Sequence, residues 1–259
     1  MIGHLYLFFF HLPLTPSLDS GSNVCYSKKE IDLWGELMDE IHSVQDLSDL
    51  VETWGIVPFF RNSIPGFSIE EHTPPDLWFS DEQDGPWEWK GPVIRQTGCA
   101  YGKFFQNKAA FISRTWFPDF ANWRRDGYDF DARYDDGLAK STDKYVFELL
   151  DGQDSLLSKD LKRLGGFGKK GRKGFDTIIT RLQMQGYVTT ADFEYQLDKS
   201  GRVYGWGVAR YATPERYFGA AFTDTVYRRA PEESKARILA HLSALLPEVS
   251  EQEILHWMG

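Results

Sequence analysis

The stretch of sequence that decides the fold, residues 155–205, reads SLLSKDLKRLGGFGKKGRKGFDTIITRLQMQGYVTTADFEYQLDKSGRVYG. Helical spacing of apolar residues predicts a short helix over residues 158–164 and a second over residues 175–185, each followed by glycine. Residues 187–197 and 202–211 are rich in β-branched and aromatic residues, and the DKSG turn between them predicts a hairpin. Helix, turn, helix and hairpin in this order predict a winged helix-turn-helix.

The charge of this stretch differs from that of the rest of the chain. Residues 155–186 carry a net charge of +6, whereas the formal net charge of the whole chain is −9. A local positive surface in an acidic protein favours a polyanionic partner, because phosphate contacts release counterions, and we expect double-stranded DNA. The alternative is a solvated basic loop. The predicted DNA-binding residues are Lys159, Lys162, Arg163, Lys169, Lys170, Arg172, Lys173 and Arg181.

The rest of the chain predicts an α+β protein that is mainly helical, with additional helices and short β-hairpins around the winged helix. Capping boxes at Ser27 and Ser250 predict helices over 28–42 and 251–257, and Ser43 can cap a helix over 44–54. Five prolines between residues 56 and 89 predict an ordered but irregular segment. A hairpin is expected over residues 99–113, a helix over 142–150 and a long helix from Pro231.

Length and composition leave the number of domains open between one and two. The chain has 259 residues, of which 42% are hydrophobic, enough to bury a sizeable core. We expect a peripheral tail over 1–23, an N-terminal helical and β region over 24–141, and the winged-helix domain with C-terminal helices over 142–259. A start codon placed too far upstream would also explain the tail.

The location of the protein is inferred from the apolar run and the cysteines. Residues 5–14 are apolar but reach about half the length that spans a bilayer, so no membrane association is expected. Cys25 and Cys99 are too few for a zinc site and are expected to be free thiols in a reducing cytoplasm. A monomer is favoured.

Motifs for metal or serine chemistry are missing from the sequence. The six histidines are scattered, and neither a His-Glu-x-x-His nor a Gly-x-Ser-x-Gly pattern occurs. Asp129, Asp131, Asp135 and Asp136 form an acidic cluster, but their spacing is not that of an EF-hand, and helix caps and ion pairs explain them better. We expect no metal and no cofactor.

The tripeptide Gln183-Met184-Gln185 next to Gly186 carries a resemblance. With the runs WEWKG from residue 87 and RRDGYDFD from residue 124, it makes the chain similar to proteins related to the AlkZ and YcaQ winged-helix DNA glycosylases. That family removes alkylated bases and has a Gln-apolar-Gln or Gln-apolar-Asp motif, which positions the water that attacks the sugar. The family's motif lies near the N-terminus, whereas here it lies two thirds along the chain, so two solvent-facing glutamines are the alternative.

The resemblance implies a possible enzyme with modest chemical demands. An alkylated purine leaves as a good leaving group, so the enzyme needs a pocket for the extruded base and an oriented water. The predicted catalytic residues are Gln183, Gln185 and Asp119, with Asp126 or Glu88 as other carboxylates, and the predicted base pocket is Trp87, Trp89 and Trp123. A non-enzymatic winged-helix transcriptional regulator and a protein-interaction module are the alternative functions.

Overall fold

The computed structural model describes residues 40–80, 83–197, 199–200 and 203–259. The predicted tail over 1–23, Cys25 and most of the predicted helix over 28–42 lie outside these residues. Residues Asp39–Gly259 form one compact unit.

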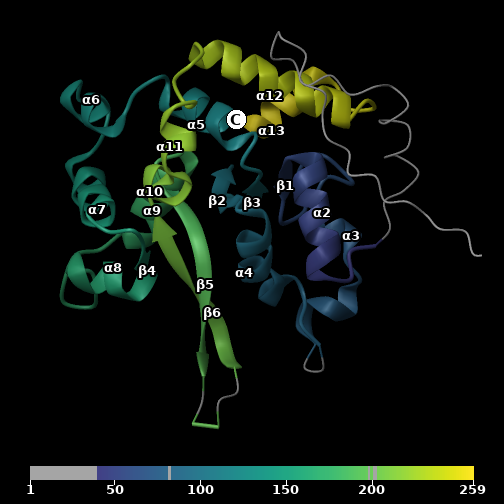
Figure 1. Cartoon of the computed structure of the whole chain (residues 1–259), viewed down its shortest axis with the longest axis horizontal. Coiled ribbons are helices and arrows are strands. Elements are labelled where there is room, and N and C mark those ends of the chain that lie inside the picture. Colours follow the sequence, from purple (N-terminus) through teal and green to yellow (C-terminus); the bar gives the residue numbers. More distant parts are fainter. Residues whose placement is uncertain (1–39, 81–82, 198, 201–202) are drawn as a thin grey trace, which may run out of the picture. The chain divides into compact units, whose positions relative to one another are not determined.

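A six-stranded antiparallel sheet runs through the middle of this unit (Figure 1). Its order is β1-β3-β2-β5-β6-β4. The strands are β1 (Ile56–Pro58), β2 (Ala100–Phe105), β3 (Lys108–Ile112), β4 (Leu156–Leu157), β5 (Thr189–Leu197) and β6 (Val203–Ala212). The pair Tyr101↔Thr190 joins β2 to β5, so strands from the first and second halves of the chain share one sheet. The predicted boundary between residues 141 and 142 stays a prediction.

Helices hold more of the chain than strands do, as the predicted fold class requires. Up to residue 135 they are α2 (Val44–Trp54), α3 (Ile69–His72), the 3-10 turn η1 (Pro75–Phe79), α4 (Pro86–Thr97), α5 (Phe117–Arg125) and α6 (Phe130–Asp135). After it they are α7 (Ser141–Asp151), α8 (Ser158–Leu164), α9 (Phe175–Met184), α10 (Pro214–Phe218), α11 (Ala220–Thr223), α12 (Pro231–Leu245) and α13 (Glu251–Met258).

The elements predicted from residues 155–205 are present. α8 and α9 occupy the two predicted helices, and β5 and β6 form the predicted hairpin. Two elements add to them, since α7 precedes the pair and the short strand β4 joins β6 through Leu156↔Tyr211. Buried side chains from the three helices form one hydrophobic core, which includes Val146, Leu161 and Ile178.

Local caps explain why α2 begins and ends where predicted. The hydroxyl of Ser43 accepts a hydrogen bond from the backbone N–H of Asp46 at the first turn. Gly55 ends the helix with a φ of +70°, a conformation that favours glycine. A methyl group at Gly55 would also overlap the indole of Trp116. The C-terminal part of the chain packs here too, because the His241 ring of α12 stacks on that indole at 4.1 Å.

Candidate nucleic-acid interface

The turn between α8 and α9, residues 165–174, is the basic loop of the predicted interface. Its backbone is closed by hydrogen bonds from Arg172 N to Gly166 O (2.8 Å) and from Gly168 N to Arg172 O (3.2 Å). The ammonium of Lys173 donates to two carbonyl oxygens of the same loop, those of Gly168 (2.9 Å) and Lys169 (2.7 Å). Lys173 therefore stabilises the shape of the loop as well as adding charge.

Several of the predicted DNA-binding residues contact other parts of the protein. Lys162 pairs with Asp176 (3.1 Å), and Arg163 pairs with Asp160 (3.4 Å). Arg172 lies 4.4 Å from the ring centroid of Tyr145 on α7. These contacts leave Lys162, Arg163 and Arg172 partly compensated within the protein.

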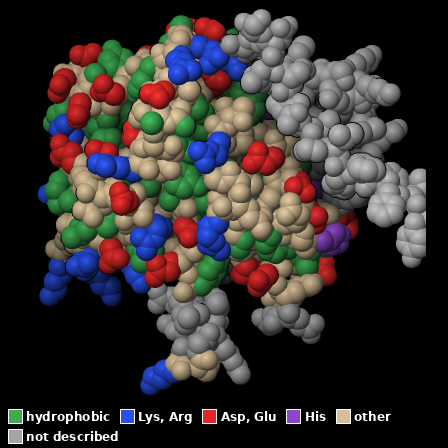
Figure 2. All heavy atoms as spheres, viewed as in Figure 1, with side chains coloured by type: hydrophobic (Ala, Val, Ile, Leu, Met, Phe, Trp, Pro, Cys, Tyr) green, Lys and Arg blue, Asp and Glu red, His purple; other side chains and the backbone are tan. Residues whose placement is uncertain are grey.

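Three lysines differ from these, and they are Lys159, Lys169 and Lys170. All three are exposed, and within the described ranges no ion pair or hydrogen bond of their ammonium groups is seen. Figure 2 shows basic side chains projecting at the lower left, below the place of α8 in Figure 1. The uncompensated positive charge of the segment is therefore concentrated at α8 and the basic loop.

Arg181 makes a different kind of contact. Its guanidinium binds the carboxylate of Asp143 through two hydrogen bonds, of which the one from Nε measures 2.6 Å. The Asp143 side chain is only 3% exposed, and the hydrogen bonds to its carboxylate raise the pKa of Arg181. Arg181 thus fixes α9 to α7, and a phosphate would have to compete with this buried carboxylate for it.

A groove of about 670 Å³ runs along the outer face of α9. Its wall on the opposite side comes from the β2–β3 hairpin and from the end of α5. Lys103, Arg124 and Arg181 bring positive charge to it, and Asp176 brings the negative charge. The lining residues are Lys103, Asn107, Arg124, Asp176, Thr177, Thr180, Arg181, Met184 and Gln185. Positive side chains therefore outnumber negative ones in the groove that lies along the second helix.

The two predicted catalytic glutamines lie in different surroundings. Gln183 is buried, and its side chain accepts a hydrogen bond from Lys103 N (3.1 Å) and donates one to Thr190 Oγ1 (3.4 Å). The alternative that both glutamines face solvent is wrong for Gln183, because this side of α9 packs on β2. Gln185 follows at the end of the helix and lines the groove. Of the pair, only Gln185 lies where a ligand in the groove would reach it.

Arg124 contributes to the lining of this groove from α5. Its guanidinium stacks on the indole of Trp123 at 4.0 Å and donates to the carbonyl oxygens of Met258 and Gly259. Burial lowers the pKa of Arg124 to about 10. The predicted base-pocket residue Trp123 therefore holds an arginine beside the groove.

Asp119, the third predicted catalytic residue, is buried on the side of α5 that packs against α12. Its carboxylate accepts hydrogen bonds from Ser234 Oγ (2.9 Å) and Arg237 Nε (3.2 Å), and Arg229 lies 3.7 Å away. These partners hold α12 against α5. No contact within the described residues joins Asp119 to Gln183 or Gln185.

The three predicted base-pocket tryptophans do not gather at one place. Trp89 is buried in the core and Trp123 lies beside the groove. Trp87 lines a second cavity of about 320 Å³, here called the aromatic pocket. Its lining residues are Phe60, Arg61, Glu70, Thr73, Pro75, Trp78, Phe79 and Trp87.

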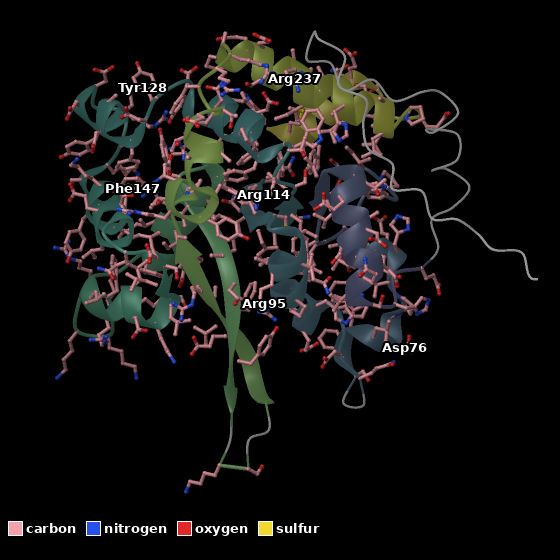
Figure 3. All side chains as sticks on the ribbon, in the orientation of Figure 1. Asp76, Arg95, Arg114, Tyr128, Phe147 and Arg237 are labelled. Atoms are coloured by element: carbon pink, nitrogen blue, oxygen red, sulfur yellow. The ribbon has the colours of Figure 1, made fainter. Side chains whose placement is uncertain are left out.

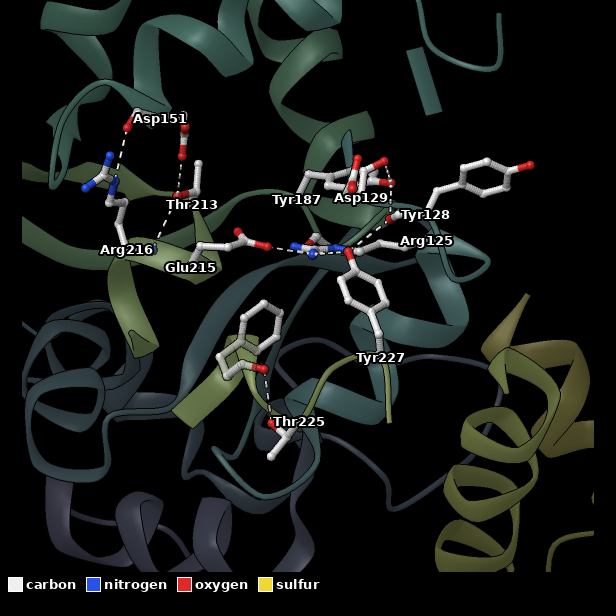
Figure 4. A network of polar contacts seen from close by, with 12 residues as sticks. Arg125, Tyr128, Asp129, Asp151, Tyr187, Thr213, Glu215, Arg216, Thr225 and Tyr227 are labelled. Atoms are coloured by element: carbon white, nitrogen blue, oxygen red, sulfur yellow. Dashed lines mark hydrogen bonds and ion pairs between the residues drawn. The ribbon is translucent and has the colours of Figure 1, made fainter. Parts of the chain in front are cut away.

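A buried arginine connects the end of α9 to its neighbours (Figure 4). Arg125 is 1% exposed, and its NH1 donates to Glu215 Oε1 (2.6 Å) and to the hydroxyl of Tyr227 (2.9 Å). Its Nε and NH2 both donate to the carbonyl oxygen of Gly186, directly after Gln185. Its pKa is raised, since the Glu215 carboxylate offsets the effect of burial. This network fixes the position of Gln185 relative to α5.

The hairpin β5–β6 contacts α4 as well as the sheet. Arg95 reaches from α4 to β5 and pairs with Asp192 at 2.5 Å (Figure 3). The hydroxyl of Tyr195 donates to the carbonyl oxygens of Trp87 (3.0 Å) and Glu88 (3.2 Å). These contacts connect the predicted wing to the helix that carries Trp87.

Sequence reasoning missed Lys103, Asn107 and Arg124 as groove residues, and Phe60, Trp78 and Phe79 as partners of Trp87. The density of aromatic residues between Phe59 and Trp89 was the available signal for the second group. The described residues contain no cluster of three histidine, cysteine or acidic side chains arranged to hold a metal. None of the helices described is long and apolar enough to cross a membrane.

Similarity to a known family extends over most of the chain. The family described as "AlkZ related" matches residues 41–259. No curated protein matches the chain. Among solved structures, the Streptomyces sahachiroi DNA glycosylase AlkZ is similar, with 13% sequence identity and a TM-score of 0.45. The match covers 90% of this chain and 65% of that one, so the chain spans just under two thirds of the length of the protein that it matches.

Proposed function

The chain belongs to the AlkZ-related family, and from that premise we propose that it binds duplex DNA in DNA repair. In this proposal, the exposed lysines of α8 and the basic loop contact phosphates, and the outer face of α9, beside the groove, lies against the DNA. The observation that carries the proposal is the exposed positive charge of Lys169 and Lys170 in the loop before α9, together with Lys103 and Arg124 in the groove along α9. A duplex that binds there exchanges condensed counterions for these side chains.

The order of elements supports a winged helix-turn-helix. The order α7, β4, α8, α9, β5, β6 places a three-helix core before a hairpin, and β4 pairs with that hairpin. In DNA-binding proteins of this type the second helix of the pair enters the major groove. The outer face of α9 carries Thr177 and Thr180, whose hydroxyls can donate to or accept from base edges.

Excision of an alkylated base is the activity that we propose for this site. Gln185 is the residue proposed to orient the attacking water, because it lines the groove and Arg125 fixes the backbone after it. Gln183 would then act by supporting β2. A binding protein without catalysis is the second candidate, favoured by the engagement of Asp119 and Gln183 in structural hydrogen bonds.

The DNA proposal can be tested with variants matched in charge. Fluorescence anisotropy with a labelled duplex of about 20 base pairs would measure affinity for the wild type and for Lys169→Glu/Lys170→Glu. The control is Lys140→Glu/Arg228→Glu, which makes the same change in net charge at exposed residues outside the interface. We expect affinity to fall at least tenfold for the first pair and much less for the control, and equal losses would contradict the proposed interface.

The enzymatic part needs its own assay. Excess protein would be incubated with duplex DNA that contains 7-methylguanine, followed by alkaline cleavage at abasic sites. Product from the wild type and its loss in Gln185→Ala would support excision. Duplex binding without product would support the second candidate.

A further inference from the structure

The aromatic pocket is separate from the groove, and the two share none of their lining residues. It lies among the segments β1, α3, η1 and α4, which the sequence left as an irregular aromatic region. Its volume of about 320 Å³ is at the lower end of the range of roughly 300–1,000 Å³ that small-molecule sites occupy. It is large enough for a ligand with a single ring system.

The walls of the pocket are flat aromatic rings. The ring centroids of Trp78 and Trp87 are 5.7 Å apart and nearly perpendicular, and Phe60 lies 5.8 Å from Trp87. Phe79 completes the lining although its side chain is 81% exposed. A phenylalanine left in water forgoes the free energy of its burial, so its exposure beside a cavity marks a surface that a ligand can cover.

The pocket also has polar groups at its wall. The Glu70 carboxylate accepts a hydrogen bond from the backbone N–H of Arg61 (2.8 Å), and both residues line the cavity. A carboxylate can accept and an arginine side chain can donate, so Glu70 and Arg61 suit the edge of a heteroaromatic ring, which carries N–H donors and ring-nitrogen acceptors. A purely aliphatic ligand could form hydrogen bonds with neither side chain.

Lys90 decides between a neutral and a cationic ring. Its ammonium lies 4.8 Å from the Trp87 centroid and 4.5 Å from that of Phe193, and the residue is 8% exposed. Within the described ranges it makes no ion pair. A positive charge already stacked on Trp87 repels a second cation near the same ring. Arg61 and Glu70 at the wall carry opposite charges, so with Lys90 the surroundings of the pocket are net positive, and the pocket favours an uncharged ligand.

We propose that the aromatic pocket binds a neutral planar heteroaromatic ring of nucleobase size, stacked among Phe60, Trp78, Phe79 and Trp87. This site goes beyond the proposed DNA interface and does not depend on it. The ring can come from a free nucleoside or from an unstacked base of single-stranded DNA, since both offer the same face and edge.

The test uses the full chain labelled with 5-fluorotryptophan. The ¹⁹F resonances of Trp78 and Trp87 are assigned with Trp78→Phe and Trp87→Phe and then followed during titration with adenosine. Three comparison probes are 1-methyladenosine, which is cationic at neutral pH, cyclohexanol, which is not planar, and single-stranded dA12. We expect adenosine to shift both resonances saturably, and both comparison small molecules to bind at least about fivefold more weakly, the loss that one base stack brings.

Phe79→Ala tests the site without touching the core, because that side chain is exposed. It should weaken adenosine binding about fivefold or more, whereas Leu138→Ala, at another exposed apolar residue, should leave it unchanged. Binding of dA12 with the same Phe79 dependence would identify DNA as a source of the ring, and adenosine alone would identify free nucleosides. Unmoved resonances at millimolar adenosine, equal binding of cyclohexanol, or equal effects of the two variants would overturn the proposal. None of these outcomes depends on duplex binding by the basic loop.

Discussion

The guanidinium of Arg125 donates two hydrogen bonds to the carbonyl oxygen of Gly186, from Nε at 3.2 Å and from NH2 at 2.8 Å. Through them, α5 holds the end of α9 at the residue after Gln185. The same guanidinium binds Glu215, so one side chain connects three separate segments of the chain.

Arg125→Met should therefore destabilise the protein strongly. The change leaves a carbonyl and a carboxylate without their buried donor, and such losses lower the free energy of unfolding by about 3–5 kcal/mol. Chemical denaturation measures it, with the exposed Arg228→Met as the control. Equal midpoints for the two variants would show that the network contributes little.

Lys90→Met should stabilise the protein at neutral pH. Burial lowers the pKa of Lys90 to about 8 from 10.5, so the folded state binds its proton less tightly than the unfolded chain. Each pKa unit corresponds to about 1.4 kcal/mol, from which the attraction between the ammonium and the aromatic rings is subtracted. We therefore expect the free energy of unfolding of the variant to be about 1–3 kcal/mol higher at pH 7. Lys140→Met, at an exposed lysine, serves as the control.

The sign of this effect can be checked by pH. Between pH 8 and 10.5 the unfolded chain keeps the proton that folded Lys90 has released. The destabilisation that the buried charge causes in the wild type therefore decreases over that range. Because the unfolded state binds more protons there, stability rises with pH, and the advantage of Lys90→Met should shrink. A difference that stays constant up to pH 10.5 would rule out the charge as its cause.

His241 should make the protein sensitive to acid. Burial lowers the pKa of its ring to about 4 from 6.5, and its Nε2 lies 2.8 Å from the carbonyl oxygen of Trp54. As pH falls from 6.5 towards 4, the unfolded chain binds a proton that the folded state does not bind. This difference lowers the free energy of unfolding by about 2–3 kcal/mol. Denaturation at several pH values should show less of this loss in His241→Gln, while the exposed His256→Gln should follow the wild type.

The lysines of the basic loop should differ in how they affect DNA binding. Lys169→Ala and Lys170→Ala each remove one exposed charge. The slope of the logarithm of affinity against the logarithm of salt concentration should become shallower by about 0.9 for each phosphate that is no longer neutralised. Lys173→Ala should in addition loosen the loop, because its ammonium binds two loop carbonyls. Faster amide exchange at residues 168–172 would reveal this, and it should be missing from the other two variants.

The two glutamines should separate stability from function. Gln183→Ala leaves the N–H of Lys103 without its acceptor and should lower the free energy of unfolding by about 1–3 kcal/mol. Gln185→Ala should leave stability nearly unchanged and alter only what happens in the groove. The reverse pattern in thermal unfolding would contradict the arrangement of α9 on β2.

Local signals made the elements of residues 155–205 predictable. Apolar spacing and the glycines after each helix determine α8 and α9, and β-branched residues on either side of a turn determine the hairpin. The strand β4 escaped prediction because its two residues are defined by pairing with β6, which lies far along the chain from it.

The candidate site was less predictable because its contacts join distant parts of the chain. Trp87 and Trp89 were predicted to share a pocket, but residues two apart on a helix point in different directions, and Trp89 enters the core. Asp119 accepts hydrogen bonds from Ser234 and Arg237 of α12, and no local sequence pattern predicts these contacts. The positive charge of the basic loop could be predicted from the sequence alone.

The pairing of Tyr101 with Thr190 has a consequence for any attempt to divide this protein. A cut between residues 141 and 142 would separate β2 from β5 and give each fragment an open strand edge with unpaired backbone groups. Tyr101, buried and packed on Phe193 at 5.5 Å, would become exposed on one fragment together with its partner on the other. Each fragment alone would be prone to aggregate. The two fragments expressed together could associate by pairing β2 with β5.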